Sequence, residues 1–206
     1  MKTPLHKTEG IIIRRFNAGE FDKILVVYTK EHGKILIKAK SLRKKGAKLR
    51  ETLELFNHVH LMLAYSKNID AVAGTTIING FPNLRTDLLA LATAHYLSEL
   101  LDKLIVAPEK DEQIWDLATK TFYFFEEKKH NSQTVEKLLE KFESHLLVSL
   151  GHPADPRQPV RLDFIQGLCG QRVESRRFLA LVPVAQKDCL CYNLIEVAQR
   201  NENKAQ

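Results

Sequence analysis

Cysteine is scarce in this sequence, and long apolar runs are missing from it. The 206 residues contain three cysteines, Cys169, Cys189 and Cys191, whose spacing matches no disulfide framework. No apolar run reaches the roughly 18 residues of a membrane span. The first ten residues lack the apolar segment of a signal peptide. We therefore expect a soluble cytoplasmic protein that does not contact membranes.

Common catalytic motifs are also missing, including the glycine-rich phosphate loop, G-x-S-x-G and H-E-x-x-H. His58 and His60 share one strand face, and the three cysteines could supply thiolates. However, the histidines have no third ligand nearby, and Cys189-x-Cys191 lacks the usual zinc-ligand spacing. We interpret these residues as an outer polar face and as buried thiols. We expect no catalytic residues, no metal and no other cofactor.

Acidic residues are absent from Lys34 to Arg50, a stretch that holds eight basic residues. Residues 1–80 contain 15 Lys/Arg against 7 Asp/Glu, a net charge of +8, whereas the whole chain carries only +6. Most charge runs are simply solvated faces. Here the lysines continue onto a predicted strand, with no acid interspersed. This pattern favours binding to a polyanion, and nucleic acid is the commonest one.

The basic residues show no order suited to reading bases, so we expect contacts to the nucleic-acid backbone with little sequence preference. We predict that the phosphate contacts are Lys38, Lys40, Arg43, Lys44, Lys45, Lys48 and Arg50, flanked by Lys34, Arg14 and Arg15. Four aromatic residues near them could stack on bases if exposed, although we expect most of them in the core: Phe16, Phe21, Tyr28 and Phe56.

Alternating and β-branched residues predict five strands in the first 80 residues, after a loose arm over 1–8. Their expected ranges are 10–16, 23–30, 34–40, 53–65 and 69–78, with Gly74 marking a possible bulge. A small five-stranded barrel of the OB type would leave no exposed edges. An SH3-like barrel is the alternative, and periodicity does not separate the two.

After Gly80 the apolar period changes to that of helices. Helices are expected over 84–105 and 111–128, and from Ser132, as N-cap, to a terminal Gly151. Shorter ones are expected over 162–168, 173–181 and 190–200. Tyr123 and Phe124 turn away from the core stripe and could contact a partner. The predicted fold class is therefore α+β, with an OB domain at 1–80 and an all-helical domain at 81–206, interrupted by a proline-rich linker at about 152–160.

Residues 9–56 resemble the opening of bacterial RecO proteins. The matching residues are Glu9-Gly10, Glu20, Asp22, Thr29, Gly33-Lys34, Ala39-Lys40, Arg43, Leu53-Glu54 and Phe56, with Ser41 in place of a glycine. Residues 81–88 (FPNLRTDL) resemble the start of that family's helical domain, and 142–151 (FESHLLVSLG) resemble a later helix. The similarity covers about 1–152, and the remaining residues match poorly.

This resemblance implies a recombination mediator that acts at the nucleoid in the repair of DNA damage. Such proteins bind single- and double-stranded DNA and anneal complementary strands. With RecR they load RecA onto strands coated by single-stranded DNA-binding protein. Many members carry a four-cysteine zinc module after the Leu-Gly pair. Here His152-Pro153-Ala154-Asp155-Pro156 follows without a cysteine pair, so this chain resembles a short form that lacks zinc.

Three other functions remain open from the residues alone. The helical domain could dock proteins, with the basic face binding ribosomes or lipids, although a β-presented stripe argues against membranes. The barrel could bind RNA instead of DNA. The third alternative is an enzyme with an unrecognised active site, although the sequence shows no nucleophile–base pair that would support this function.

Overall fold

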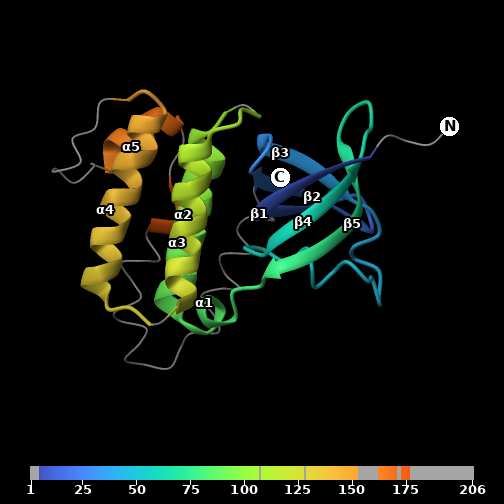
Figure 1. The fold of residues 1–206 in the computed structure, drawn as a ribbon, viewed down its shortest axis with the longest axis horizontal. Helices are drawn as coiled ribbons and strands as arrows, with labels where there is room; N and C mark the ends of the chain where they lie inside the picture. Colours follow the sequence, from blue (N-terminus) through green and yellow to red (C-terminus); the bar gives the residue numbers. More distant parts are fainter. Residues whose placement is uncertain (1–4, 107, 128, 153–161, 171–172, 177–206) are drawn as a thin grey trace.

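A computed structural model describes residues 5–106, 108–127, 129–152, 162–170 and 173–176. Five strands come first: β1 (Leu5–Ala18), β2 (Asp22–Thr29), β3 (Gly33–Ala39), β4 (His58–Ala64) and β5 (Asp70–Asn79). The helices follow: α1 (Pro82–Thr86), α2 (Leu88–Leu104), α3 (Glu112–Glu127), α4 (Ser132–Ser149) and α5 (Leu162–Cys169). The strands form a barrel beside the helices, with α2 against β1 (Figure 1).

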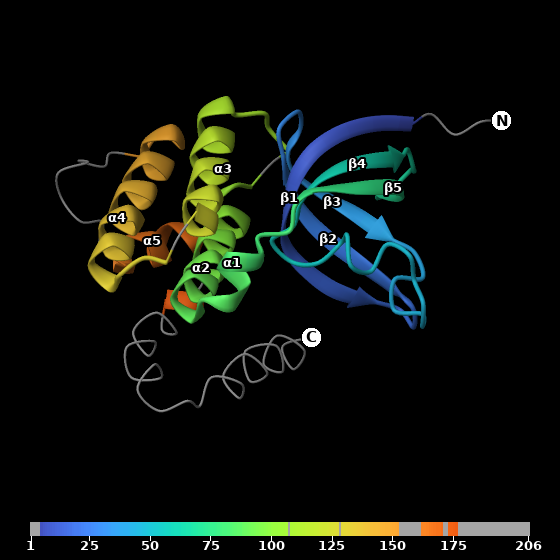
Figure 2. The same cartoon turned by 60° about the horizontal axis from the view of Figure 1, so that its bottom comes forward.

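The barrel is closed in the order β1-β2-β3-β5-β4. Only β3 and β5 pair in parallel. The first half of β1 pairs with β4 and its second half with β2, with a register shift between Ile12 and Arg14. Such a bulge bends a strand, and in Figure 2 β1 curves along the barrel. The predicted fold class, a five-stranded OB barrel followed by helices, is confirmed.

Two glycines fit positions where a side chain would clash. A Cβ atom on Gly10, where β1 passes from one partner strand to the other, would lie 2.6 Å from Cγ1 of Val27. Gly33 turns the β2–β3 hairpin with a φ of +64°, and a Cβ atom there would lie 2.0 Å from the carbonyl oxygen of Glu109. The hairpin can therefore pack closely against the segment before α3.

The buried apolar side chains form two clusters. One fills the barrel: Ile12, Leu25, Val27, Ile37, Ala39, Leu42, Leu53, Val59, Leu61 and Leu63. The predicted alternation in β3 is confirmed, since Ile37 and Ala39 face this interior and Leu36 is exposed. The other cluster joins the helices to an outer face of the barrel, to which the barrel contributes Ile11, Ile13, Val26, Tyr28 and Phe56.

Two strand boundaries differ from the sequence prediction by several residues. The loose arm expected over 1–8 is wrong for its second half, because Leu5 to Thr8 pair with β4. The fourth strand begins at His58 instead of residue 53. Residues 53–57 turn instead, with Phe56 at a φ of +69°. The apolar alternation there came from side chains that are buried without being part of a strand.

Two helix boundaries differ as well. The single helix expected over 84–105 is divided into α1 and α2 at Asp87, whose side chain accepts hydrogen bonds from the amides of Leu89 and Ala90. Aspartate is a strong N-cap, so it starts a new helix there. The N-cap of α4 is Asn131, not Ser132, because the Asn131 side chain accepts from the Thr134 amide at 2.8 Å.

Some predictions fall on parts that the structure does not describe. These are most of the linker at 152–160, the helix at 173–181 beyond residue 176, and the helix at 190–200. Cys189 and Cys191 also lie outside the described residues. The division into two domains at residue 80 stays a prediction. Within the described part of the chain, no helix has the length and apolar character needed to cross a membrane.

Candidate nucleic-acid interface

Residues 40–57, between β3 and β4, carry most of the predicted phosphate contacts and are called the basic loop here. Its start is fixed by Asp22 on β2. The Ser41 amide donates to Oδ1 of Asp22 at 2.8 Å, and Nζ of Lys38 lies 3.1 Å from Oδ2. These contacts, the amide first, hold the pKa of Asp22 below its usual value. The loop is therefore attached to the β1–β2 hairpin.

The loop folds into successive turns held by backbone hydrogen bonds. The amides of Lys44, Ala47 and Arg50 each donate to a carbonyl three residues earlier. Leu42 and Leu53 are buried in the barrel core, and Leu49 packs beside them. Because the leucines occupy the interior, the basic side chains between them lie on the outside.

Six of the ten predicted cations are exposed on this segment. Arg50 donates to loop carbonyls, and the other five are Lys40, Arg43, Lys44, Lys45 and Lys48. Among the residues that the structure describes, none of these five forms an ion pair. The Arg43 guanidinium donates to the Gly19 carbonyl at 3.4 Å. Nζ of Lys44 lies 5.2 Å from the centre of the Phe21 ring. These five charges are therefore available to an anionic ligand.

Arg14 and Lys34 lie instead against the helical part of the molecule. Nη1 of Arg14 is 2.9 Å from Oδ2 of Asp102 on α2, and Nζ of Lys34 is 3.5 Å from Oδ1. Lys34 also donates to the backbone carbonyl of Asp102. The Asp102 carboxylate thus neutralises two of the three predicted flanking cations and links β1 and β3 to α2.

The remaining predicted cations have protein partners within the barrel. Nη1 of Arg15 is 2.7 Å from Oε1 of Glu54 and donates to the Leu53 carbonyl at 3.2 Å. Arg50 donates to the carbonyls of Leu42, Arg43 and Lys44 at 3.4, 3.0 and 2.8 Å. Lys38 pairs with Asp22. Phosphate contact stays a prediction for all ten residues.

A pocket of about 260 Å³ lies where the basic loop meets β1 and β2. Four basic side chains and one acid line it, together with Asn17 and Leu42: Arg15, Lys23, Arg43, Arg50 and Glu54. Burial is the largest effect on Lys23 and lowers its pKa, and the neighbouring Arg15 lowers it further. Lys23 was not predicted as a site residue, because a single lysine at a strand start gives no signal in the sequence.

The aromatic residues near the loop differ in exposure. Tyr28 and Phe56 are buried, as expected for core residues, and Phe16 packs against the helical cluster. Phe21, at the β1–β2 turn, is 40% exposed beside Lys44. Of these four residues, Phe21 presents the ring that a nucleic-acid base could reach.

His58 is buried, so the prediction of an outer polar face is wrong for this residue and right for the exposed His60. Nε2 of His58 lies 2.9 Å from Oε1 of Glu9, and Nδ1 lies 3.2 Å from the hydroxyl of Tyr123 on α3. Burial lowers the pKa of His58, and Glu9 opposes that effect. Through these two contacts His58 links β1 and β4 of the barrel to α3.

Other predicted candidates have contacts within the chain. Tyr123 packs on Phe81, and Phe124 stacks on His130 with ring centres 3.8 Å apart. Both side chains are half-buried, and contact with a partner stays a prediction for them. Cys169 is half-buried, and burial raises its pKa. Among the described residues, no group of three His, Cys, Asp or Glu side chains could hold a metal ion.

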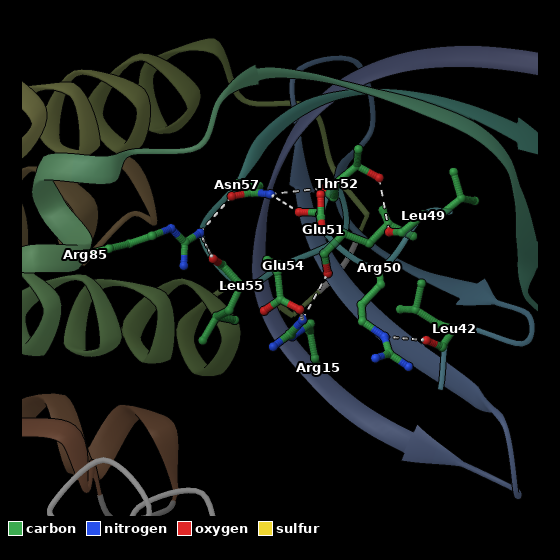
Figure 3. Close-up of polar contacts among 11 residues, drawn as sticks. Arg15, Leu42, Leu49, Arg50, Glu51, Thr52, Glu54, Leu55, Asn57 and Arg85 are labelled. Atoms are coloured by element: carbon green, nitrogen blue, oxygen red, sulfur yellow. Dashed lines mark hydrogen bonds and ion pairs between the residues drawn. The ribbon is translucent and has the colours of Figure 1, made fainter. Parts of the chain in front are cut away.

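Arg85 on α1 holds the end of the basic loop to the helices. Its guanidinium donates to the carbonyls of Gly80 and Leu55 at 2.7 and 2.6 Å, and to Oδ1 of Asn57 at 2.7 Å. Asn57 in turn donates to the carbonyls of Glu51 and Thr52 (Figure 3). Arg85 belongs to the 81–88 segment noted in the sequence, but its structural role was not predicted.

Two family models match the chain in sequence order. One, described as recombination protein O N terminal, matches residues 1–81, and the other, recombination protein O C terminal, matches residues 85–161. The chain belongs to the recombination protein O (RecO) family. The resemblance noted in the sequence is thereby confirmed.

Several curated relatives carry the name DNA repair protein RecO. The protein of a Roseiflexus species is 32% identical over 152 residues, which are 74% of this chain and 52% of the relative. That of Dehalococcoides mccartyi is 36% identical over 152 residues, 74% of this chain and 58% of the relative. That of Symbiobacterium thermophilum is 32% identical over 147 residues, 71% and 57%. The matched region thus spans somewhat more than half of these relatives.

Proposed function

We propose that this chain binds single- and double-stranded DNA through the exposed cations of the basic loop and acts in DNA repair and recombination. The observation that carries the proposal is the group of five exposed basic side chains without an ion-pair partner in the described residues. They lie on one loop that leucines and Asp22 hold against an OB barrel. Lysine and arginine side chains in such an arrangement bind phosphates and displace counterions.

Annealing of complementary strands would follow from the same surface. Two strands repel each other through their phosphates, and basic side chains that neutralise both would let the bases pair. No bond is made or broken in this process, so we propose a binding protein and not an enzyme. The family resemblance also implies that the protein acts with a RecR-like partner to load RecA onto strands coated by single-stranded DNA-binding protein. We include these partners in the proposal for the whole protein.

The test measures binding of a fluorescent single-stranded oligonucleotide at several salt concentrations. A loop variant carries Lys44→Ala, Lys45→Ala and Lys48→Ala. A matched control removes the same charge from α4 and the segment before it, with the exposed residues Lys129→Ala, Lys137→Ala and Lys141→Ala. If the three loop lysines each contact one phosphate, the slope of log affinity against log salt should fall in magnitude by about 2, since each phosphate contributes about 0.7.

The proposal would be wrong if the parent failed to bind at low salt, or if the two variants bound equally well. The first result would favour a protein-docking function for the helical part. A matched RNA oligonucleotide and an annealing assay complete the design. RNA binding much tighter than DNA binding would contradict the choice of DNA as ligand.

A further inference from the structure

The pocket beside the basic loop has an excess of positive charge around a small volume. Four cations and one carboxylate line about 260 Å³. This volume lies near the lower end of the range for small-molecule sites, about 300 Å³, so the pocket is large enough to hold an anionic group such as a phosphate.

Two of the three arginines that line the pocket, Arg15 and Arg50, are held in place by several contacts with the protein. Arg15 is fixed through Nη1 by Glu54 and the Leu53 carbonyl. Arg50 donates to the Leu42 carbonyl, a contact drawn in Figure 3, and to the carbonyls of Arg43 and Lys44. Among the described residues, no acceptor meets Nη2 of Arg15 or Nη1 of Arg50. Each guanidinium therefore keeps N–H donors for another acceptor. Their fixed positions reduce the conformational entropy lost on binding.

Glu54 neutralises only one of the four cations. Burial lowers the pKa of Lys23, and the positive charges of Arg15, Arg43 and Arg50 all lower it further, while Glu54 alone opposes them. The cations are thus crowded enough to disfavour each other's charge. An anion in the pocket would relieve this repulsion and accept the unused arginine hydrogen bonds.

We propose that this pocket holds one backbone phosphate of a bound nucleic-acid strand and sets the strand's position on the barrel. This inference rests on the proposed function. Nucleic acid is favoured over an acidic peptide because the pocket is continuous with the exposed loop cations through Arg43. The exposed ring of Phe21 lies beside the same loop, since Nζ of Lys44 is 5.2 Å from the ring centre. A neighbouring base could stack there.

The test compares two variants of the full chain that lose the same charge. The pocket variant carries Lys23→Met and Arg43→Ala, and the surface variant carries Lys45→Ala and Lys48→Ala. Binding of a fluorescent single-stranded oligonucleotide is measured over a salt series and extrapolated to 1 M salt, where the counterion contribution vanishes. Matching circular dichroism spectra and urea midpoints check that both variants fold.

We expect both variants to show a smaller salt slope. Only the pocket variant should also lose affinity in the 1 M extrapolation, by about ten-fold, because hydrogen bonds from fixed donors do not depend on counterion release. In nitrogen-15 spectra of the parent, the oligonucleotide should shift the Nε signals of Arg15 and Arg50. Inorganic phosphate should shift the same signals, and the oligonucleotide should displace it.

Other outcomes would overturn the inference. If the oligonucleotide binds while the two variants match and the arginine signals stay unchanged, the pocket is not used and the proposed function still stands. If inorganic phosphate or an acidic peptide occupies the pocket and the oligonucleotide does not displace it, the ligand class is wrong. If no oligonucleotide binds at low salt, the proposed function fails and this inference fails with it.

Discussion

At the level of single residues, His95 shows how the packing of helices on the barrel controls ionisation. It lies on α2, and its ring meets Phe56 edge-on, with ring centres 4.8 Å apart. Burial lowers its pKa from 6.5 to about 4, and Glu99, one turn further along the helix, opposes this only partly. The folded protein therefore holds this imidazole neutral at pH values where the unfolded chain would protonate it.

We expect this residue to make the protein less stable in mild acid. Between pH 6.5 and about 4 the unfolded chain binds a proton that the folded chain excludes, so stability falls as pH falls through this range. From pH 7.5 to pH 5 the loss from His95 should be about 2 kcal/mol. Urea unfolding of the parent and of His95→Gln at both pH values measures it.

The comparison rests on the difference in pH dependence, because His95→Gln can change stability at every pH. His60→Gln, at an exposed histidine, serves as the control for the substitution itself. Parallel curves of unfolding free energy against pH for the parent and His95→Gln would contradict the assignment.

At the level of elements, the basic loop is held by a partner outside the barrel. Arg85 on α1 binds the Leu55 carbonyl and the Asn57 side chain, and Asn57 binds two further carbonyls of the loop. The guanidinium reaches three oxygens at once because its donors form a planar fork. Arg85 is half-buried, and this burial lowers its pKa.

Replacing Arg85 with Lys should therefore destabilise the protein although the charge is kept. An ammonium group cannot reach all three acceptors, and buried carbonyls without a donor cost about 1–3 kcal/mol each. We expect the free energy of unfolding in urea to fall by about 2–3 kcal/mol. Arg43→Lys, in the exposed part of the loop, should change it by less than about 0.5 kcal/mol. Equal stability of the two variants would show that Arg85 does not hold the loop.

The elements themselves were largely predictable from the sequence, because alternation and helical periodicity report on burial. The errors occur where the pattern of buried residues continues but the backbone does not continue the same strand or helix. Leu53 is buried in a turn, and Asp87 divides a continuous apolar stripe by capping α2. Leu5 to Thr8 form a strand because they pair with β4, and nothing in those four residues alone indicates this pairing.

The candidate site was predictable only as a run of charge. Which cations stay free depends on acids that are distant in sequence: Asp22 holds Lys38, Glu54 holds Arg15, and Asp102 holds Arg14 and Lys34. Lys23 was missed because it lies far from Arg43 and Arg50 in the sequence, and the folded barrel brings the three side chains together at the pocket. Local sequence patterns do not reveal ion pairs between residues that lie far apart in the sequence.

At the level of the whole molecule, the helices and the barrel share one apolar cluster. Five barrel side chains are buried in it: Ile11, Ile13, Val26, Tyr28 and Phe56. Burial of such side chains contributes roughly 1.5–3 kcal/mol each, about 8–15 kcal/mol together. A domain's net stability is only about 5–15 kcal/mol. We therefore expect the barrel to lose stability without the helices, even though the sequence predicts a boundary at residue 80.

We expect a fragment of residues 1–81 to be unstable as a monomer, because this outer face would be exposed to water. Size-exclusion chromatography should show association, and urea unfolding should show a broad transition at lower urea than in the full chain. The same fragment with Ile13→Thr and Val26→Thr should associate less, since both substitutions keep a β-branched residue while reducing the apolar surface. A monomeric fragment that unfolds cooperatively at the midpoint of the full chain would contradict this expectation. It would mean that the predicted division at residue 80 separates two independent folding units, because the shared cluster would then add little to the barrel.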